Sequence, residues 1–418
     1  MIAERDGEVD LAIKIDEASA QHGDLLPAHD AAAAKFADRP LRILGVDPEL
    51  GFAGGETQVL GLTLGLLRGG HQASLACDPR GRLYERARRE GIECHPLAIR
   101  NALDLAAGMR LRNLLADVRY DIVHFHTSRA HSMAPFARGR AGALVVTRRM
   151  DYRPNRLFAP YLYNRAVDGV AAISNQVADA LGEAGVARDH VRIIASGVDC
   201  NHFHPADSSE REQARARLGI TREVFLAGTV GMIEERKGHR YLLEAIAILN
   251  RARGEKSRVK CAIAGDGAIR DELASLAGEL GITSDTLFLG MVSGSRQLLD
   301  ALDVFVFPSL KEGLGVALLE AMACGLPVVA TRAGGVIDIV EDNQNRQSGL
   351  LVSPRDPASL ASAIASLEND TTRRAQLGLA ARIRIRENFS MDAMTKKTID
   401  LYRACLIGRT ASPEEAKH

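Results

Sequence analysis

The sequence predicts an α/β protein with two doubly wound domains. Short apolar strands alternate with helical stretches, a pattern typical of parallel sheets covered by helices on both faces. The alternation stops at a polar stretch near residues 200–220 and then restarts. A chain of 418 residues is long enough for two or three domains. The cleft between two such domains is the default place for an active site.

Each element follows from a local pattern. In the first half, apolar runs predict strands, and the glycines at 69 and 70 end the first of two helices. The second half repeats this pattern. The expected strands are 41–47, 71–77, 121–126, 143–147, 168–174 and 191–196, then 224–231, 259–267, 286–290, 303–309 and 326–331. The expected helices are 55–70, 104–119, 237–253, 268–281 and 391–407.

The same pattern divides the chain into six segments. The first is an acidic appendage, disordered or helical, that Pro40 ends. The last helix is amphipathic and could pack back on the first domain. The expected segments are the appendage 1–40, an N-terminal Rossmann-like domain 41–203, a linker 204–222, a C-terminal Rossmann-like domain 223–390, the last helix 391–408 and a tail 409–418.

Composition excludes several classes of protein. Hydrophobic residues make up 46% and charged residues 25%, which is ordinary for a soluble globular chain. No apolar run approaches the ~20 residues of a membrane-spanning helix, and the N-terminus lacks the pattern of a secretory signal. The six cysteines form no Cys-x-x-Cys pair, so we expect reduced thiols in a cytoplasmic protein. A net charge of zero gives no general attraction to nucleic acid.

Basic residues are unevenly distributed. Residues 41–205 carry 21 arginines and no lysine against 16 acidic residues, a net charge of +5. Guanidinium groups bind phosphate and carboxylate bidentately, so this surplus favours an anionic ligand. Use of arginine for lysine by a GC-rich genome would explain it equally well, and the sequence leaves both explanations open.

The segment 308–331 carries the most chemical information. A strand ends at Pro308, a loop holds Glu312, Gly313 and Gly315, and a helix containing Glu320 follows. The glycines let the backbone approach a ligand, and the start of the helix offers free N–H groups to a phosphate. A carboxylate inside an apolar helix needs a partner. Two partners remain open for Glu320, a pair of sugar hydroxyls or a nearby arginine.

Glu312 and Glu320, separated by GLGVALL and followed by AMACGLPVVAT, strongly resemble the nucleotide-sugar site of retaining glycosyltransferases of family 4, the group 1 glycosyltransferases. The resemblance covers residues 41 to about 405. It implies the GT-B fold, two Rossmann-like domains facing across a cleft. It also implies that Glu312 contacts the transferred sugar, that Glu320 contacts the ribose, and that the backbone at Leu314 and Gly315 meets the diphosphate.

Other segments resemble the same family. Gly54 and Gly55 match its glycine-rich loop near the donor phosphate or the acceptor, although by themselves they fit a simple strand-to-helix turn. Lys237 matches the lysine that meets the diphosphate. The arginine usual in this segment is replaced by Met232; Arg236 is either its substitute or a solvated charge.

Three further donor positions follow from the resemblance. Gly265 and Gly267 are expected near the base and phosphate, and Met291 is expected to border the base. Ile337 and Asp338 stand where relatives often have Pro-Glu, a local departure from the family pattern.

The segment DIVHFHTSRAH offers three histidines. His124 and His126 share one face of a strand, but a metal site with His131 would need further ligands. The resemblance implies instead that His126 approaches the donor sugar and that His124 is structural. The expected catalytic residues are therefore Glu312, His126 and Lys237, with no metal and no cofactor beyond the nucleotide diphosphate sugar.

The resulting hypothesis is a retaining, metal-independent glycosyltransferase that acts on an acceptor hydroxyl. Arg148, Arg149 and Arg153 are expected to bind an anionic or lipid-linked glycan, such as a lipopolysaccharide intermediate, at the inner membrane face. A second basic run, at residues 80–89, is expected to contribute to the same binding. A nicotinamide-dependent oxidoreductase would need G-x-G-x-x-G after the first strand, which is absent. The remaining alternative is a GT-B sugar-nucleotide epimerase or a non-catalytic relative that binds sugar nucleotides.

Overall fold

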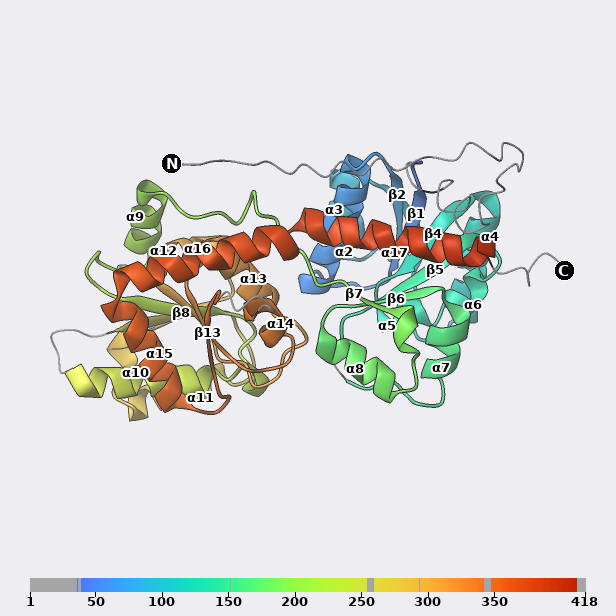
Figure 1. Ribbon diagram of the computed structural model, residues 1–418. Helices are drawn as coiled ribbons and strands as arrows, with labels where there is room; N and C mark the ends of the chain where they lie inside the picture. The colour runs from blue at the N-terminus through green and yellow to red at the C-terminus, as the bar shows by residue number, and fades with distance from the viewer. Residues whose placement is uncertain are drawn as a thin grey trace, which may run out of the picture.

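The structure is a computed structural model in which two α/β domains lie side by side (Figure 1). Almost all of the appendage 1–40, and the tail from 412 onwards, lie outside the described residues. Among the residues that are described, no helix is long and apolar enough to cross a membrane. The structure describes residues 36, 39–150, 152–253, 259–292, 294–341 and 347–411.

The first domain is built on a parallel sheet with the strand order β3-β2-β1-β4-β5-β6-β7 in the described chain. The order reverses between β1 and β4, which is where open α/β sheets bind ligands. The sequence does not predict β3, because this half-exposed edge strand has no apolar run. The strands are β1 (Arg42–Asp47), β2 (Gln72–Cys77), β3 (Glu93–Pro96), β4 (Tyr120–Phe125), β5 (Ala141–Arg148), β6 (Gly169–Ala172) and β7 (Val191–Ile193).

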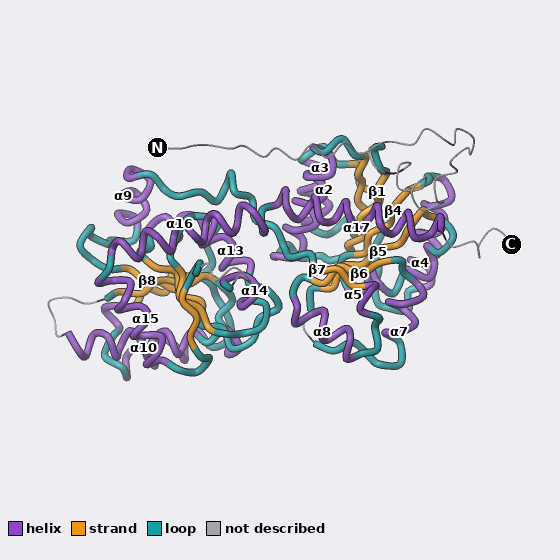
Figure 2. The backbone as a smooth tube through the Cα atoms, in the orientation of Figure 1, coloured by secondary structure: helices purple, strands orange, loops and turns teal. Residues whose placement is uncertain are grey.

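Helices cover both faces of this sheet (Figure 2). The first long helix, α2, begins at the carboxyl end of β1, where the Glu56 carboxylate accepts a hydrogen bond of 2.7 Å from the Ala53 N–H. The helices are α2 (Gly54–Arg68), α3 (Arg82–Arg89), α4 (Leu105–Asp117), α5 (Ser128–His131), α6 (Ala134–Ala137), α7 (Ala159–Tyr161) and α8 (Asn175–Glu183), with a π-helical turn at Leu162–Ala166.

The second domain repeats this architecture with the strand order β10-β9-β8-β11-β12-β13. The three-residue strand β13 is too short to be predicted from its pattern. The strands are β8 (Leu226–Val230), β9 (Lys260–Ala264), β10 (Thr286–Gly290), β11 (Val304–Phe307), β12 (Val328–Thr331) and β13 (Leu350–Val352). The helices are α9 (Ser208–Arg217), α10 (His239–Arg253), α11 (Arg270–Glu279), α12 (Arg296–Ala301), α13 (Val316–Ala323), α14 (Val336–Val340), α15 (Pro357–Asn369) and α16 (Thr371–Asn388).

The chain crosses between the domains twice, and the two crossings touch. The Val198 N–H donates to the Phe389 carbonyl and the Met391 N–H donates to the Val198 carbonyl, both at 2.9 Å. A Cβ on Gly197 would lie 2.8 Å from the Met391 Cα, so only glycine fits there. After the second crossing, α17 (Met391–Ala411) packs against α2, β5 and β6 of the first domain, where Tyr402 is fully buried.

Candidate active site

A cavity of about 420 Å³ opens between the two domains. Its walls come from segments that follow strand ends, because parallel strands place their carboxyl ends along one edge of a sheet. The cavity therefore brings together predicted residues that are far apart in the sequence. The first domain contributes Gly54, Gly55, Arg149, Met150, Ile173 and Ser196, and the second contributes Arg236 and residues 311–316, which include Glu312, Leu314 and Gly315.

An ion pair between Lys237 and Glu312 lies on the second-domain wall. The lysine Nζ is 2.6 Å from the glutamate Oε2, and the two side chains are only 15% and 12% exposed. The Ser309 hydroxyl donates to the same oxygen at 3.4 Å. The ammonium group also lies 5.5 Å from the centre of the Phe307 ring, within cation–π range. A ligand that takes up one of the two charges must therefore compensate the other.

The start of α13 faces the same cavity. Gly315, the residue before the helix, has a φ of 104°, and a Cβ there would lie 3.1 Å from the Phe307 ring, so glycine is required. Leu314 also lines the cavity, although it is only 2% exposed. The helix begins directly after this turn, so its first N–H groups supply positive potential at the cleft.

Glu320 pairs with a serine in this structure. The Ser295 hydroxyl donates to the Glu320 Oε2 at 2.6 Å, and burial raises the pKa of the carboxyl group. This partner is neither of the two that the sequence left open, a pair of sugar hydroxyls or an arginine. The sequence did not single out Ser295, which lies 25 residues before the glutamate.

The three histidines have different environments. Both ring nitrogens of His124 are hydrogen-bonded, to the hydroxyls of Tyr402 and Thr147 at 2.7 Å each. His131 is likewise bonded through both nitrogens. His126 is buried, and no hydrogen-bond partner for its Nδ1 is present among the described residues. Burial lowers the pKa of His126 well below its ordinary value, so the ring is neutral. The part of the chain that the structure describes holds no group of three or more His, Cys, Asp or Glu residues arranged for a metal ion.

The three arginines expected at the acceptor have different environments. Arg148 is 3% exposed because it ends β5, and its guanidinium bonds to the Ser128 hydroxyl at 3.1 Å. Arg153 lies on the surface in an ion pair with Glu183. Of the three, Arg149 alone lines the cavity.

Arg236 lines the cavity and is 46% exposed. Its guanidinium pairs with Glu234 at 2.7 Å. Met291, expected near the base, follows β10 and is 78% exposed. These two residues are placed at the domain surface, where a ligand could still reach them.

Gly265 and Gly267 hold two loops of the second domain together. A Cβ on Gly265 would lie 1.8 Å from the Gly231 carbonyl oxygen, and one on Gly267 would lie 2.2 Å from the Ile233 carbonyl oxygen. The Ile233 N–H donates to the Asp266 carbonyl at 2.9 Å. These glycines therefore shape the loop that leads to Lys237, whether or not they also touch a ligand.

Comparison with known proteins identifies the family. The family model for Glycosyl transferases group 1 matches residues 210–384, and the model for Glycosyltransferase Family 4 matches residues 52–202. The alpha-maltose-1-phosphate synthase of Mycolicibacterium smegmatis is 31% identical over 302 residues, which are 69% of this chain and 75% of that protein. The chain is a group 1 glycosyltransferase.

Two further proteins are similar to this group 1 glycosyltransferase. A lipopolysaccharide core biosynthesis glycosyltransferase of Rhizobium meliloti is 29% identical over 293 residues, covering 70% of this chain and 78% of that protein. The structure of Anabaena HepE in complex with UDP-glucose superposes with a TM-score of 0.73 at 22% identity, covering 86% of this chain and 98% of that one. The superposition and the two parallel sheets establish the GT-B fold.

Gly265→Ala should destabilise this group 1 glycosyltransferase. Its φ is 141° and the added Cβ would meet a carbonyl oxygen, so we expect a loss of about 1–3 kcal/mol in the free energy of unfolding. Gly278→Ala is the matched control, because its Cβ would meet nothing closer than 3.9 Å. As an exposed helical position it should gain about 0.5–1 kcal/mol. Urea unfolding measures both, and equal effects of the two substitutions would contradict the loop contact.

Proposed function

We propose that this group 1 glycosyltransferase is a retaining, metal-independent enzyme that moves a sugar from a nucleotide diphosphate sugar to a hydroxyl group of an acceptor. The observation that carries the proposal is the joint placement of Lys237, Glu312 and the start of α13 on one wall of the cleft. HepE was solved in complex with UDP and with UDP-glucose, which supports a nucleotide sugar as the donor here.

In this proposal the second domain stabilises the leaving diphosphate. The bond between the anomeric carbon and the diphosphate oxygen breaks, and negative charge grows on that oxygen. Lys237 and the first N–H groups of α13 offset this charge in a cleft that restricts water. Lys237 then exchanges Glu312 for the diphosphate, and Glu312 accepts a hydrogen bond from the transferred sugar instead.

The remaining donor contacts follow from burial and hydrogen bonding. Glu320 holds the ribose hydroxyls in place of the Ser295 hydroxyl, and the neutral His126 hydrogen-bonds the sugar. The acceptor hydroxyl attacks the face that the diphosphate leaves, so the anomeric configuration is kept. Its proton passes to the leaving diphosphate, and no covalent enzyme intermediate and no metal ion are needed.

A lipid-linked, anionic glycan is the proposed acceptor, used at the cytoplasmic face of the inner membrane. Exposed apolar side chains support this: Leu157, Phe158 and Tyr161 follow Met150 along the chain, and Met150 lines the cavity. The side chains of Leu157, Phe158 and Tyr161 are 83%, 68% and 54% exposed. Arg153 lies on the same segment, and the relative from Rhizobium meliloti acts in lipopolysaccharide core biosynthesis.

A donor screen tests the proposal directly. Purified protein is incubated with UDP-, GDP- and ADP-sugars, and released nucleotide and sugar products are followed by mass spectrometry and NMR. Turnover that is equal in EDTA and in added manganese, with an α-linked product from an α-linked donor, is the expected result. Loss of turnover in EDTA would contradict the metal-free mechanism. Conversion of one sugar nucleotide into its epimer would favour the epimerase alternative.

Glu320→Gln should weaken nucleotide binding more than it slows turnover. A ribose contact is similar in the ground and transition states, and loss of a hydrogen bond to a buried charged group costs about 1–3 kcal/mol. Titration calorimetry with UDP measures the change. Glu279→Gln, on the exposed end of α11, is the control and should bind as the wild type does. Unchanged affinity in Glu320→Gln would remove this residue from the site.

Replacing Leu157 and Phe158 together by serine should reduce binding to vesicles that contain an anionic phospholipid. These exposed side chains would otherwise insert at the lipid surface, where each buried CH₂ contributes about 0.8 kcal/mol. Sedimentation with the vesicles measures the bound fraction. Leu379→Ser is the control, because Leu379 is 61% exposed on α16 of the other domain. Equal sedimentation of both variants would refute a membrane-facing role for Leu157 and Phe158.

A further inference from the structure

Three neighbouring strands of the first domain end in polar side chains that each have one buried atom without a hydrogen-bond partner among the described residues. Asp47 ends β1, His126 follows β4 and Arg149 follows β5, and these strands are adjacent in the sheet. Within the described residues, no hydrogen bond is made by the Asp47 Oδ2, the His126 Nδ1 or the Arg149 Nε. Asp47 is 1% exposed and His126 is 4% exposed. Buried polar atoms almost always have partners, so three unpartnered ones at one sheet edge require an explanation.

Of the three residues at this edge, Arg149 is the one that lines the cavity. Val46 lies opposite Phe125 in the sheet, and the His126 N–H donates to the Val46 carbonyl at 3.0 Å, so Asp47 and His126 are neighbours. Arg149 lines the cavity and donates to the Ser196 hydroxyl at 3.3 Å. The charge of Arg149 acts to lower the pKa of Asp47, and the charge of Asp47 acts to raise the pKa of Arg149, although no direct ion pair joins the two side chains.

Asp78, at the end of the adjacent strand β2, shows that the local turn does not explain Asp47. Each of the two aspartates accepts a hydrogen bond of 3.0 Å from the N–H two residues further on. The second oxygen of Asp78 accepts from the Arg80 guanidinium at 2.8 Å. The second oxygen of Asp47 accepts from nothing described.

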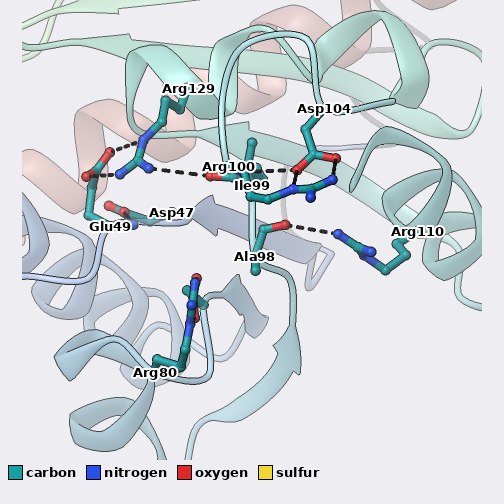
Figure 3. Close-up of polar contacts among 10 residues, drawn as sticks. Asp47, Glu49, Arg80, Ala98, Ile99, Arg100, Asp104, Arg110 and Arg129 are labelled. Atoms are coloured by element: carbon teal, nitrogen blue, oxygen red, sulfur yellow. Dashed lines mark hydrogen bonds and ion pairs between the residues drawn. The ribbon is translucent and has the colours of Figure 1, made fainter. Parts of the chain in front are cut away.

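Arg129 and Arg100, which are drawn with Asp47 in Figure 3, each form an ion pair with another carboxylate. Figure 3 shows Glu49, two residues beyond Asp47, joined to Arg129, and Asp104 joined to Arg100. These neighbouring carboxylates therefore have partners that Asp47 lacks. The Asp47 Oδ2 is therefore open to a hydrogen bond from a ligand.

The chemistry of the unpartnered atoms narrows the kind of ligand. An ionised carboxylate only accepts hydrogen bonds, whereas a guanidinium only donates them. A hydroxyl group can donate to the first and accept from the second at once. Sugars and other polyols carry hydroxyl groups in closely spaced pairs, and the cavity beside Arg149 opens to both domains.

We propose that Asp47 and Arg149 form the acceptor-hydroxyl site of this enzyme, in which the Asp47 Oδ2 accepts a hydrogen bond from an acceptor hydroxyl and the Arg149 Nε donates to the same or the adjacent hydroxyl. The inference rests on the proposed function, and it adds a residue, Asp47, that the sequence pattern did not indicate. It places the acceptor against the first domain, opposite Lys237 and Glu312.

The unpartnered state of Asp47 has a consequence for stability. Burial raises the pKa of Asp47 to about 7, and the backbone N–H of Glu49 opposes this shift. Because the pKa in the folded state lies above that of an unfolded aspartate, ionisation costs folding free energy as pH rises from about 4 to about 7, and the cost persists at higher pH. The titratable or charged groups that surround Asp47 are Glu49, Glu56, Cys77, His126 and Arg149.

Asp47→Asn and Asp78→Asn form a matched pair for the test. In Asp47→Asn the amide side chain keeps the oxygen that the Glu49 N–H needs. Each variant is assayed with the nucleotide sugar that turns over in the donor screen and with glycerol as the probe acceptor, while water competes for the sugar. The ratio of glyceryl glycoside to free sugar measures acceptor binding, and UDP titration measures donor binding. Thermal unfolding at about pH 5 and about pH 8 measures stability.

Asp47→Asn should lower the glycoside-to-sugar ratio by about tenfold or more, which is the factor for one lost hydrogen bond of about 1.4 kcal/mol. Its UDP affinity should stay within about twofold of the wild type, and its melting temperature should rise, more at about pH 8 than at about pH 5. Asp78→Asn should leave the ratio unchanged and lower the melting temperature, because the Arg80 side chain holds the pKa of Asp78 below its ordinary value.

Three results would overturn the inference. The first is an unchanged product ratio in Asp47→Asn. The second is a melting temperature of Asp47→Asn that falls at high pH, as that of Asp78→Asn is expected to do. The third is a wild-type enzyme that hydrolyses the donor but never glycosylates glycerol. Failure of the proposed function looks different, because no variant and no wild-type protein would then release sugar from any nucleotide. The comparison of melting temperatures would still decide whether Asp47 lacks a partner.

Discussion

The double crossing of the chain between the domains is the constraint on which the cleft depends. Val198 pairs with Phe389 and Met391, and the Gln58 side chain of α2 bonds both the N–H and the carbonyl of Gly197, at 2.7 and 2.8 Å. These bonds tie both crossings to the helix that begins at the cavity. The hydrogen-bonded crossings connect the two sheets at one place. The segments that follow β1, β5 and β7 therefore face those that follow β8 and β11 across the cavity.

The last helix extends this constraint to the strand end that carries His126. The Tyr402 hydroxyl on α17 bonds the His124 ring, whose centre lies 4.0 Å from that of His126. A second tie lies beside Glu312: the Asp338 carboxylate accepts from the backbone N–H and the side-chain amide of Asn175, at 2.8 and 2.9 Å. The position where relatives often have Pro-Glu thus links α14 of one domain to α8 of the other.

The two walls of the cleft differ in how their charges are compensated. On the second-domain wall, Lys237 and Glu312 neutralise each other, so the proposed donor binding requires both side chains to exchange partners. In the first domain, Asp47 is buried and Arg149 lines the cavity, and no direct ion pair joins them. Buried groups without partners cost stability, and proteins retain such costs mainly at sites of binding or catalysis.

The sequence by itself determined the two-domain α/β architecture and which residues of one segment line the second-domain wall of the cavity. The apolar strands are long enough to read from their pattern, and Glu312, Leu314, Gly315 and Glu320 lie within one continuous segment whose local geometry is set by its own glycines. The short strands β3 and β13 carry no such pattern. Only the tertiary structure decided which arginine reaches the cleft, that Ser295 meets Glu320 and that Asp47 stands beside His126. These relations join residues from different strands and helices, and the spacing along the chain contains no information about which of them share an edge.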